Sequence, residues 1–219
     1  FFATVSFPDP HHPFNPPGKY WDMYKPEDFA VPEAFTRNDW TPPPHVATTL
    51  AARESGDANL RGMRTIGCTA REAQEARALT AGMITCVDDA IGVVLEALRA
   101  SGHADNTVLI FTTDHGDHLG DHRLLLKGAE HYQGIVHVPF IWAEPQTHGA
   151  RRTDGLGSTM DIPATVLDRA GLTPYAGMQG KSLLPVISDD AAVQDVLLIQ
   201  YEHQMALPAS ASNGGGYKT

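Results

Sequence analysis

The sequence predicts an α/β protein, in which helices flank a sheet. Apolar residues recur at helical spacing over 69–100, and a capping box of Thr69 and Glu72 opens this stretch. A short polar turn then leads into an apolar strand at 108–112, which gives a helix-to-strand unit. That strand ends in Asp-His-Gly, and α/β proteins build their sites at this edge of the sheet. The length of 219 residues allows one domain with a sizeable core.

The N-terminal part of the chain predicts one strand and a long irregular segment. Residues 1–7 are aromatic and β-branched, which predicts a buried strand. The stretch 8–44 holds ten of the sixteen prolines, and 53–68 is rich in glycine and charge. We therefore expect an irregular, proline-rich excursion over 8–68. Its aromatic side chains either cover a pocket or anchor the segment to the surface.

The long helix is expected to end near Ala100, with Gly102 as its C-terminal cap. Its apolar stripe is wide, which predicts packing against a sheet. Asp88 and Asp89 lie mid-helix beside this stripe. We interpret them as a solvated or capping pair and not as a functional one.

Beyond the first strand, apolar runs at 138–143 and 196–201 predict two more strands. A helix is expected at 161–170, ended by Gly171. The Gly- and Ser-rich tail at 209–216 is expected to be flexible or to form a loop.

Composition and charge exclude several classes of function. The net charge of −10 argues against a nucleic-acid surface and requires local positive charge at any site for an anion. We find no uninterrupted apolar run long enough to span a bilayer and expect no membrane span. Cys68 and Cys86 do not make a disulfide framework. The chain starts with Phe1 inside a predicted strand, which indicates a fragment.

The candidate functional residues are most concentrated directly after the strand at 108–112. Asp114 and His115 are candidate metal ligands, and Gly116 would let the chain turn so that both reach one ion. In the alternative, the Asp caps a turn and the His hydrogen-bonds to it. His118 and His122 could chelate zinc only if the stretch were helical, which its glycines disfavour.

Several motifs in order resemble the sulfatase family of the alkaline phosphatase superfamily. They are Thr-Asp-His-Gly at 113–116 with Leu-Gly-Asp-His at 119–122 and Lys127, His-Val-Pro at 137–139, the helix at 158–172, and the strand with Pro-His-His-Pro at 1–14. The resemblance implies an alkaline-phosphatase-like, mostly parallel mixed sheet flanked by helices and incomplete in this chain. Residues 1–219 would then be part of one α/β domain.

The same resemblance implies metal-dependent hydrolysis of a small anionic sulfate ester. One divalent ion, calcium, would be held by Asp114 and His115, with manganese or zinc in its place in a phosphonate or phosphate ester hydrolase. Lys127 would contact the sulfate and the leaving-group oxygen. Without the resemblance, these residues could be ordinary surface and turn residues.

Three histidines have roles only through the resemblance. His11 aligns with the family histidine that protonates or hydrogen-bonds the leaving group, and His12 is the alternative for that role. His122 would orient the loop or contact the substrate. A non-catalytic histidine in a proline-rich loop remains the plainer interpretation of His11.

The formylglycine nucleophile of the family has no match here. Cys68 is followed by Thr-Ala-Arg, which puts Arg71 one place too early, with Glu72 in the required position. We expect the nucleophile and the remaining carboxylates on an upstream segment or a complementary N-terminal polypeptide, with this chain inactive alone. The alternative is a non-catalytic metal-binding fragment. The oligomeric state stays open.

Overall fold

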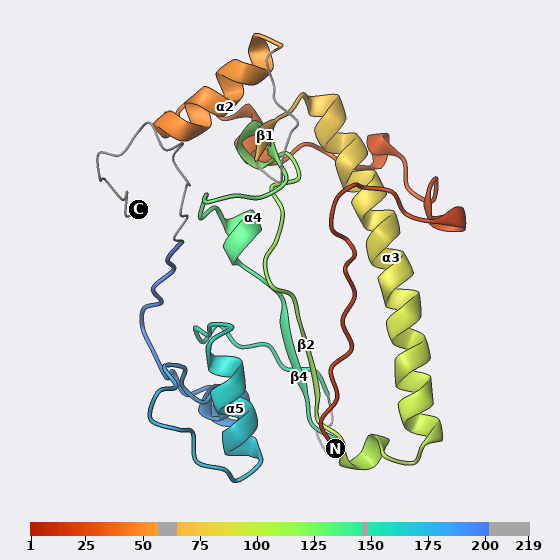
Figure 1. Cartoon of the computed structure of the whole chain (residues 1–219), viewed down its shortest axis with the longest axis vertical. Helices are drawn as coiled ribbons and strands as arrows, with labels where there is room; N and C mark the ends of the chain where they lie inside the picture. Colours follow the sequence, from red (N-terminus) through yellow and green to blue (C-terminus); the bar gives the residue numbers. More distant parts are fainter. Residues whose placement is uncertain (57–64, 146–148, 202–219) are drawn as a thin grey trace, which may run out of the picture. The chain divides into compact units, whose positions relative to one another are not determined.

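A computed structural model describes residues 1–56, 65–145 and 149–201 (Figure 1). The chain divides into two compact units. The first consists of Phe1–Thr107 and His115–Phe140, and the second of Val108–Asp114 and the chain from Ile141 onward. The prediction that the chain is part of one domain stays a prediction.

The first unit is organised around the long helix α3, Ala70–Ala100. The Thr69 hydroxyl accepts a hydrogen bond from the Glu72 backbone N–H at 3.2 Å, and the Glu72 carboxylate accepts one from the Thr69 N–H at 2.8 Å. This reciprocal pair satisfies two backbone donors that the helix itself leaves open. At the other end, Gly102 follows the helix with φ +74°. The predicted helix and both of its caps are confirmed.

The packing of α3 differs from the expectation that its stripe lies against a sheet. Among the described residues, it packs mainly on two 3-10 turns, η1 (Gly18–Tyr20) and η2 (Pro26–Asp28). Its buried residues all lie in the first half, the last of them being Met83. In the second half Val93 is 70% exposed. The periodicity predicted which face is apolar but not what covers it.

By length and composition α3 could cross a membrane, which corrects the expectation that nothing in the chain is apolar enough. An 18-residue stretch of it has a mean hydropathy of 1.7, and 22% of that stretch is buried. Core helices of soluble proteins meet the same criterion of length and hydropathy. Asp88 and Asp89 lie in α3, and Asp89 accepts hydrogen bonds from Lys19 and Tyr20. Adjacent carboxylates would be costly in a bilayer.

The predicted strand at 1–7 is wrong, because these residues form no strand ladder among the described residues and Phe1 is 87% exposed. A strand needs a neighbour for its backbone hydrogen bonds, and none pairs with 1–7 among the described residues. The run at 196–201 forms no ladder either, and Val196 is exposed. Apolar and β-branched residues favour the strand conformation, but a strand forms only where a neighbouring segment pairs with it.

The proline-rich segment is more ordered than predicted. Besides η1 and η2 it contains α1, Glu33–Thr36, and α2, Pro44–Glu54. Pro44 occupies the first turn of α2, where its missing N–H costs nothing. Part of the predicted connecting stretch, 57–64, lies outside the described residues.

Two small sheets are present in the described part of the chain. In the first, β1 (Ile66–Gly67) pairs antiparallel with β3 (Leu124–Leu125), and Ile66 lies opposite Leu125. In the second, β2 (Leu109–Thr112) pairs with β4 (Phe140–Ala143). These two strands confirm the predicted positions. Their apolar sequence also favours burial, but Phe111 and Ile141 are exposed.

The remaining elements are short. They are η3 (Ala104–Asn106), η4 (Asp121–Arg123), α4 (Gln133–Val136), α5 (Asp161–Arg169) and α6 (Leu184–Asp189). The helix α5 and the positive φ of Gly171 confirm the predicted helix and its end. The buried Asp161 carboxylate accepts hydrogen bonds from the backbone N–H groups of Ser158 and Lys181, at 2.7 and 2.8 Å. The predicted tail at 209–216 lies outside the described residues.

Candidate functional site

The candidate site begins at Gly116, where the predicted turning freedom is wrong and a close backbone approach requires glycine instead. Its backbone N–H donates to the Ile135 carbonyl at 2.8 Å, and a Cβ at Gly116 would overlap the carbonyl oxygen of Gly134. The φ of Gly116 is not positive, so turning freedom is not what this position needs. Glycine is required because two backbone segments approach closely.

The loop after Gly116 is supported by the first half of α3. Gly120 has φ +96°, and an added Cβ would lie 2.7 Å from the Ala73 Cβ. Arg77 of α3 donates to the Leu119 carbonyl at 3.4 Å. Leu125 of the same loop belongs to the core cluster that contains Ala73. The position of this loop therefore depends both on its own glycine and on the small residues of α3 that pack against it.

The two predicted metal ligands fall on either side of the boundary between the units. In the second unit, the Thr113 hydroxyl donates to Asp114 Oδ1 at 3.2 Å. In the first, the Nδ1–H of His115 donates to the Gly116 carbonyl, at 2.8 Å. That hydrogen bond leaves Nε2 as the nitrogen with a lone pair, as a metal-binding imidazole requires. The donor chemistry of both residues thus fits a divalent ion.

A complete metal site is not assembled among the described residues, where no group of three His, Cys, Asp or Glu side chains could hold an ion. Two donors fall short of the six or more oxygen-rich ligands that calcium takes. The alternative zinc pair is not favoured, because His118 lies against Glu130 and His122 lies against Asp121.

Lys127 lies beside a histidine of the proline-rich segment, but this histidine is His12 and not His11. The distance from Lys127 Nζ to His12 Nδ1 is 3.2 Å. The ring of His11 stacks on that of His12, with 4.1 Å between centroids. Burial, Lys127 and His11 lower the pKa of His12, and Asp117 opposes them. Residues separated by more than a hundred positions thus form one polar cluster.

His122 is enclosed by aromatic rings. It stacks on Tyr132 at 3.9 Å with an interplanar angle of 13°, and Trp40 meets it edge-on at 4.6 Å. Its side chain is 14% exposed, and Nδ1 lies 3.4 Å from Asp121 Oδ2. This environment favours the loop-orienting role over direct substrate contact. Trp40 shows that the proline-rich segment supplies packing to the loop.

Sequence reasoning missed a buried polar pair in this loop. His118 is 2% exposed, and its Nε2 lies 3.6 Å from Glu130 Oε2, which also accepts a hydrogen bond from Thr65 at 2.8 Å. Burial alone would raise the pKa of Glu130, but His118, Thr65 and a backbone N–H outweigh it and lower that pKa to about 2. The sequence carried no signal beyond two polar residues in a polar-looking loop.

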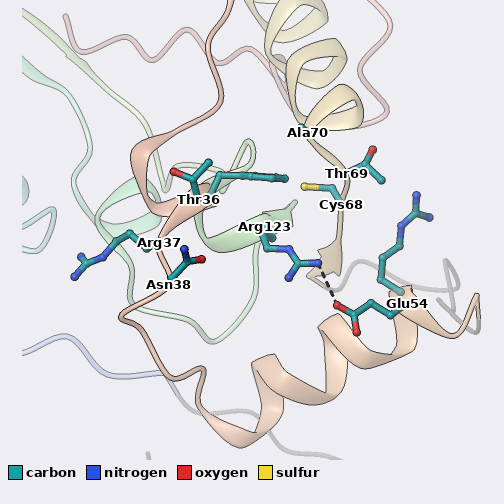
Figure 2. Close-up of a pocket in the computed structure, with 10 residues that line it drawn as sticks. Thr36, Arg37, Asn38, Glu54, Cys68, Thr69, Ala70 and Arg123 are labelled. Atoms are coloured by element: carbon teal, nitrogen blue, oxygen red, sulfur yellow. Dashed lines mark hydrogen bonds and ion pairs between the residues drawn. The ribbon is translucent and has the colours of Figure 1, made fainter.

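A cavity of about 640 Å³ in the first unit is lined by none of the predicted site residues (Figure 2). It is lined by Arg37, Arg53, Glu54, Cys68 and Arg123, among others. Each of its guanidinium groups already has a carboxylate partner, for example Glu54 for Arg123 at 3.2 Å. Burial raises the pKa of the Cys68 thiol to about 12, so this thiol is a poor nucleophile. The rejection of Cys68 as a catalytic residue is supported by this geometry.

Comparison with known proteins gives consistent results. The sequence profile of a family described as Sulfatase matches residues 1–172. An arylsulfatase of Clostridium perfringens is 33% identical over 198 residues, which cover 86% of this chain and 38% of that enzyme. The chain therefore spans well under half the length of such relatives.

Two solved structures are also similar. A phosphonate monoester hydrolase of Agrobacterium radiobacter is 32% identical with a TM-score of 0.68, over 84% of this chain and 38% of that one. Another, from Silicibacter pomeroyi, is 26% identical with a TM-score of 0.69, over 85% and 37%. These similarities confirm the predicted α/β fold class.

Proposed function

The chain belongs to the sulfatase family, and on that premise we propose that it carries part of the active site of a metal-dependent sulfate ester hydrolase. The observation that carries the proposal is the cluster of Lys127 with the histidines of the Pro-His-His-Pro segment. It gathers a cation and two proton-carrying groups in a chain whose net charge is −10. A small anionic ester needs such local positive charge.

Asp114 and His115 would hold one divalent ion, with the other ligands supplied from outside these 219 residues. Calcium suits a site rich in carboxylates, whereas the imidazole would also suit manganese or zinc. Such an ion stabilises negative charge on the oxygens of the bound ester. The hydrogen bond from His115 Nδ1–H to the Gly116 carbonyl orients the ring for this role.

Lys127 and His11 would act on the group that leaves. When the bond between sulfur and the ester oxygen breaks, negative charge develops on that oxygen, and the Lys127 ammonium stabilises it. A proton from His11 converts the oxygen to the hydroxyl of the departing alcohol or phenol. The Nδ1 of His11 lies 2.5 Å from the His12 carbonyl, so Nε2 is the nitrogen that would carry this proton.

The nucleophile would be a formylglycine on a segment outside this chain. Cys68, with its buried thiol of raised pKa, does not substitute for it. This is why we expect the 219 residues alone to be inactive. The full reading frame, or a complementary polypeptide, would supply the missing half of the site.

Phosphonate or phosphate ester hydrolysis is the second candidate function. The identities to the arylsulfatase and to the Agrobacterium phosphonate hydrolase, 33% and 32%, are almost equal. Both substrates present a tetrahedral anion next to an ester oxygen, so the cluster around Lys127 serves either. The metal would then be manganese or zinc.

The test is hydrolysis of an aryl sulfate and of an aryl phosphonate monoester by the protein expressed from its full reading frame. Lys127→Ala is expected to lower kcat by about 10²- to 10³-fold, the usual loss when a charge-stabilising donor is removed. Lys19→Ala is the control, since Lys19 pairs with Asp89 at the surface. Unchanged turnover in Lys127→Ala would remove this residue from the mechanism. The ratio of the two wild-type rates decides between sulfate and phosphonate.

Metal content gives a readout that does not depend on turnover. Asp114→Asn should lower the bound divalent metal, measured by mass spectrometry after exhaustive dialysis, because it removes a charged oxygen ligand. Asp88→Asn is the matched control, since Asp88 lies within α3. Equal metal content in both variants would argue against Asp114 as a ligand.

A further inference from the structure

We infer that His12 is a positioning residue. It contacts both Lys127 and His11, and it holds the cation and the proton-carrying histidine of the cluster in place. The inference deepens the proposed function, and its activity measurement rests on that function. The sequence offered His12 only as an alternative to His11. The geometry gives it a separate task.

The first half of the task concerns Lys127. An ammonium group has donors only, so the 3.2 Å contact makes Nδ1 of His12 the acceptor. His12 is then neutral, with its proton on Nε2. Lysine has a long, flexible side chain whose freedom is lost when the ammonium is held in one place. An acceptor in a fixed ring restricts the ammonium before substrate arrives.

The second half concerns His11. Its ring lies 4.1 Å from the ring of His12, with an angle of 29° between the planes. Its Nδ1–H donates to the His12 carbonyl. Both the side chain and the backbone of His12 therefore orient His11, and Nε2 is the ring nitrogen of His11 that remains to transfer a proton. The prolines on either side, Pro10 and Pro13, limit the backbone freedom of this pair.

The charges around His12 agree with a neutral acceptor. Burial lowers its pKa most, Lys127 and His11 lower it further, and Asp117 raises it. A protonated His12 would point a donor at an ammonium and repel it. The contact with Lys127 and the neutral state of the ring thus support each other.

The experiment separates the two contacts with paired variants in the protein expressed from its full reading frame. His12→Phe keeps a ring against His11 and removes the acceptor. His12→Asn keeps an acceptor, its Oδ1, near the position of Nδ1 and removes the ring. We expect His12→Phe to lower kcat by about 10- to 100-fold with little change in KM. This is the usual loss when a residue that orients an active-site side chain is replaced. His12→Asn should restore the part of the loss that comes from Lys127 and keep the part that comes from the lost ring contact with His11, so its kcat should lie between those of the wild type and His12→Phe.

The same substitution in a Lys127→Met background shows whether His12 acts through Lys127. If it does, His12→Phe changes kcat there by no more than about twofold, the usual scatter between independent sites. An equal loss in both backgrounds, or a loss in His12→Asn as large as in His12→Phe, would overturn the inference.

A spectroscopic measurement keeps the inference testable if the protein does not hydrolyse either ester. Histidine labelled with ¹⁵N reports the protonation of each ring nitrogen, and His12→Gln assigns the His12 signals. We expect an unprotonated Nδ1 for His12, whose resonance moves in Lys127→Met while that of His122 stays. A protonated Nδ1, or a His12 resonance that does not change in Lys127→Met, would refute the contact between Lys127 and His12, whether or not the protein is active. Absent hydrolysis with a confirmed contact would refute the proposed function alone.

Discussion

The two halves of α3 have the same kind of sequence but different surroundings. From Ala70 to Met83 the helix buries small residues against η1, η2 and the loop that starts at Gly116. From Ile84 to Ala100 the helix has no buried residue among those described, and Ile84, Val93 and Val94 are exposed. Periodicity is therefore equal evidence for a helix in both halves, and only packing distinguishes the half that supports the candidate site.

The largest effect is expected for Met83→Ala. Met83 is 1% exposed, so truncation leaves a cavity and should lower the free energy of unfolding by about 3 kcal/mol. Val93→Ala in the second half is the control and should change it by less than about 0.5 kcal/mol. Urea denaturation of both variants measures the difference. Equal losses would mean that the second half is packed as tightly as the first in solution.

A glycine pair on the same helix should respond with opposite signs. At Gly82 an added Cβ would overlap the Tyr20 carbonyl oxygen, whereas at Gly92 it meets nothing within 4 Å. Gly82→Ala should therefore destabilise by about 2 kcal/mol through overpacking. Gly92→Ala should stabilise by about 0.5–1 kcal/mol, the helix propensity difference. Thermal unfolding of the two variants is the measurement, and a stabilising Gly82→Ala would contradict the packing of η1 on α3.

The buried Glu130 predicts acid sensitivity in the loop that the first half supports. Its folded-state pKa of about 2 lies below the ordinary value of 4.5. The carboxylate therefore stabilises the fold above pH 4.5, and this contribution is lost as the pH falls towards 2. It amounts to at most about 3 kcal/mol. Glu130→Gln should remove about 2 kcal/mol of stability at pH 7 and flatten this part of the pH profile.

The control for Glu130 lies in the second half of α3. Glu96 forms a surface ion pair with Arg99 at 3.4 Å and is 74% exposed. Glu96→Gln should change stability by about 0.3 kcal/mol, as expected for an exposed ion pair. If the stability of Glu130→Gln fell with pH as steeply as that of the wild type, the acid-sensitive group would be a residue other than Glu130.

The smallest effect is expected at the start of α3. Thr69→Ala removes the hydroxyl that accepts from the Glu72 N–H and should cost about 1 kcal/mol. Ser101→Ala at the other end removes only a hydroxyl that donates to the Leu98 carbonyl, and it should cost less. Equal changes in the free energy of unfolding for the two variants would mean that the capping box does not stabilise the helix.

The elements predicted well are those whose signals are local. The capping box, the glycine that follows α3, the strands β2 and β4 and the helix α5 depend on residues near one another in sequence. The strands expected at 1–7 and 196–201 failed because pairing depends on partners that the local sequence does not contain. Pro44 was read as a sign of irregular chain, although proline is well suited to the first turn of a helix.

The candidate site divides in the same way. The motif residues Asp114, His115 and Lys127 were identified from their order in the chain, and their roles stay predictions. The contact between Lys127 and His12 could not be predicted, because it joins residues 115 positions apart. The enclosure of His122 by Trp40 and Tyr132 depends likewise on a distant segment.

The sequence alone determined the α/β class, the family and the residue types that a hydrolytic site needs, because capping, periodicity and ordered motifs are written in neighbouring residues. Only the tertiary structure decided that Gly116 serves a close backbone approach, that Glu130 is a buried carboxylate of low pKa, and that His12 is the histidine beside Lys127. Burial and contact are properties of surfaces brought together by the fold, and no local pattern contains them.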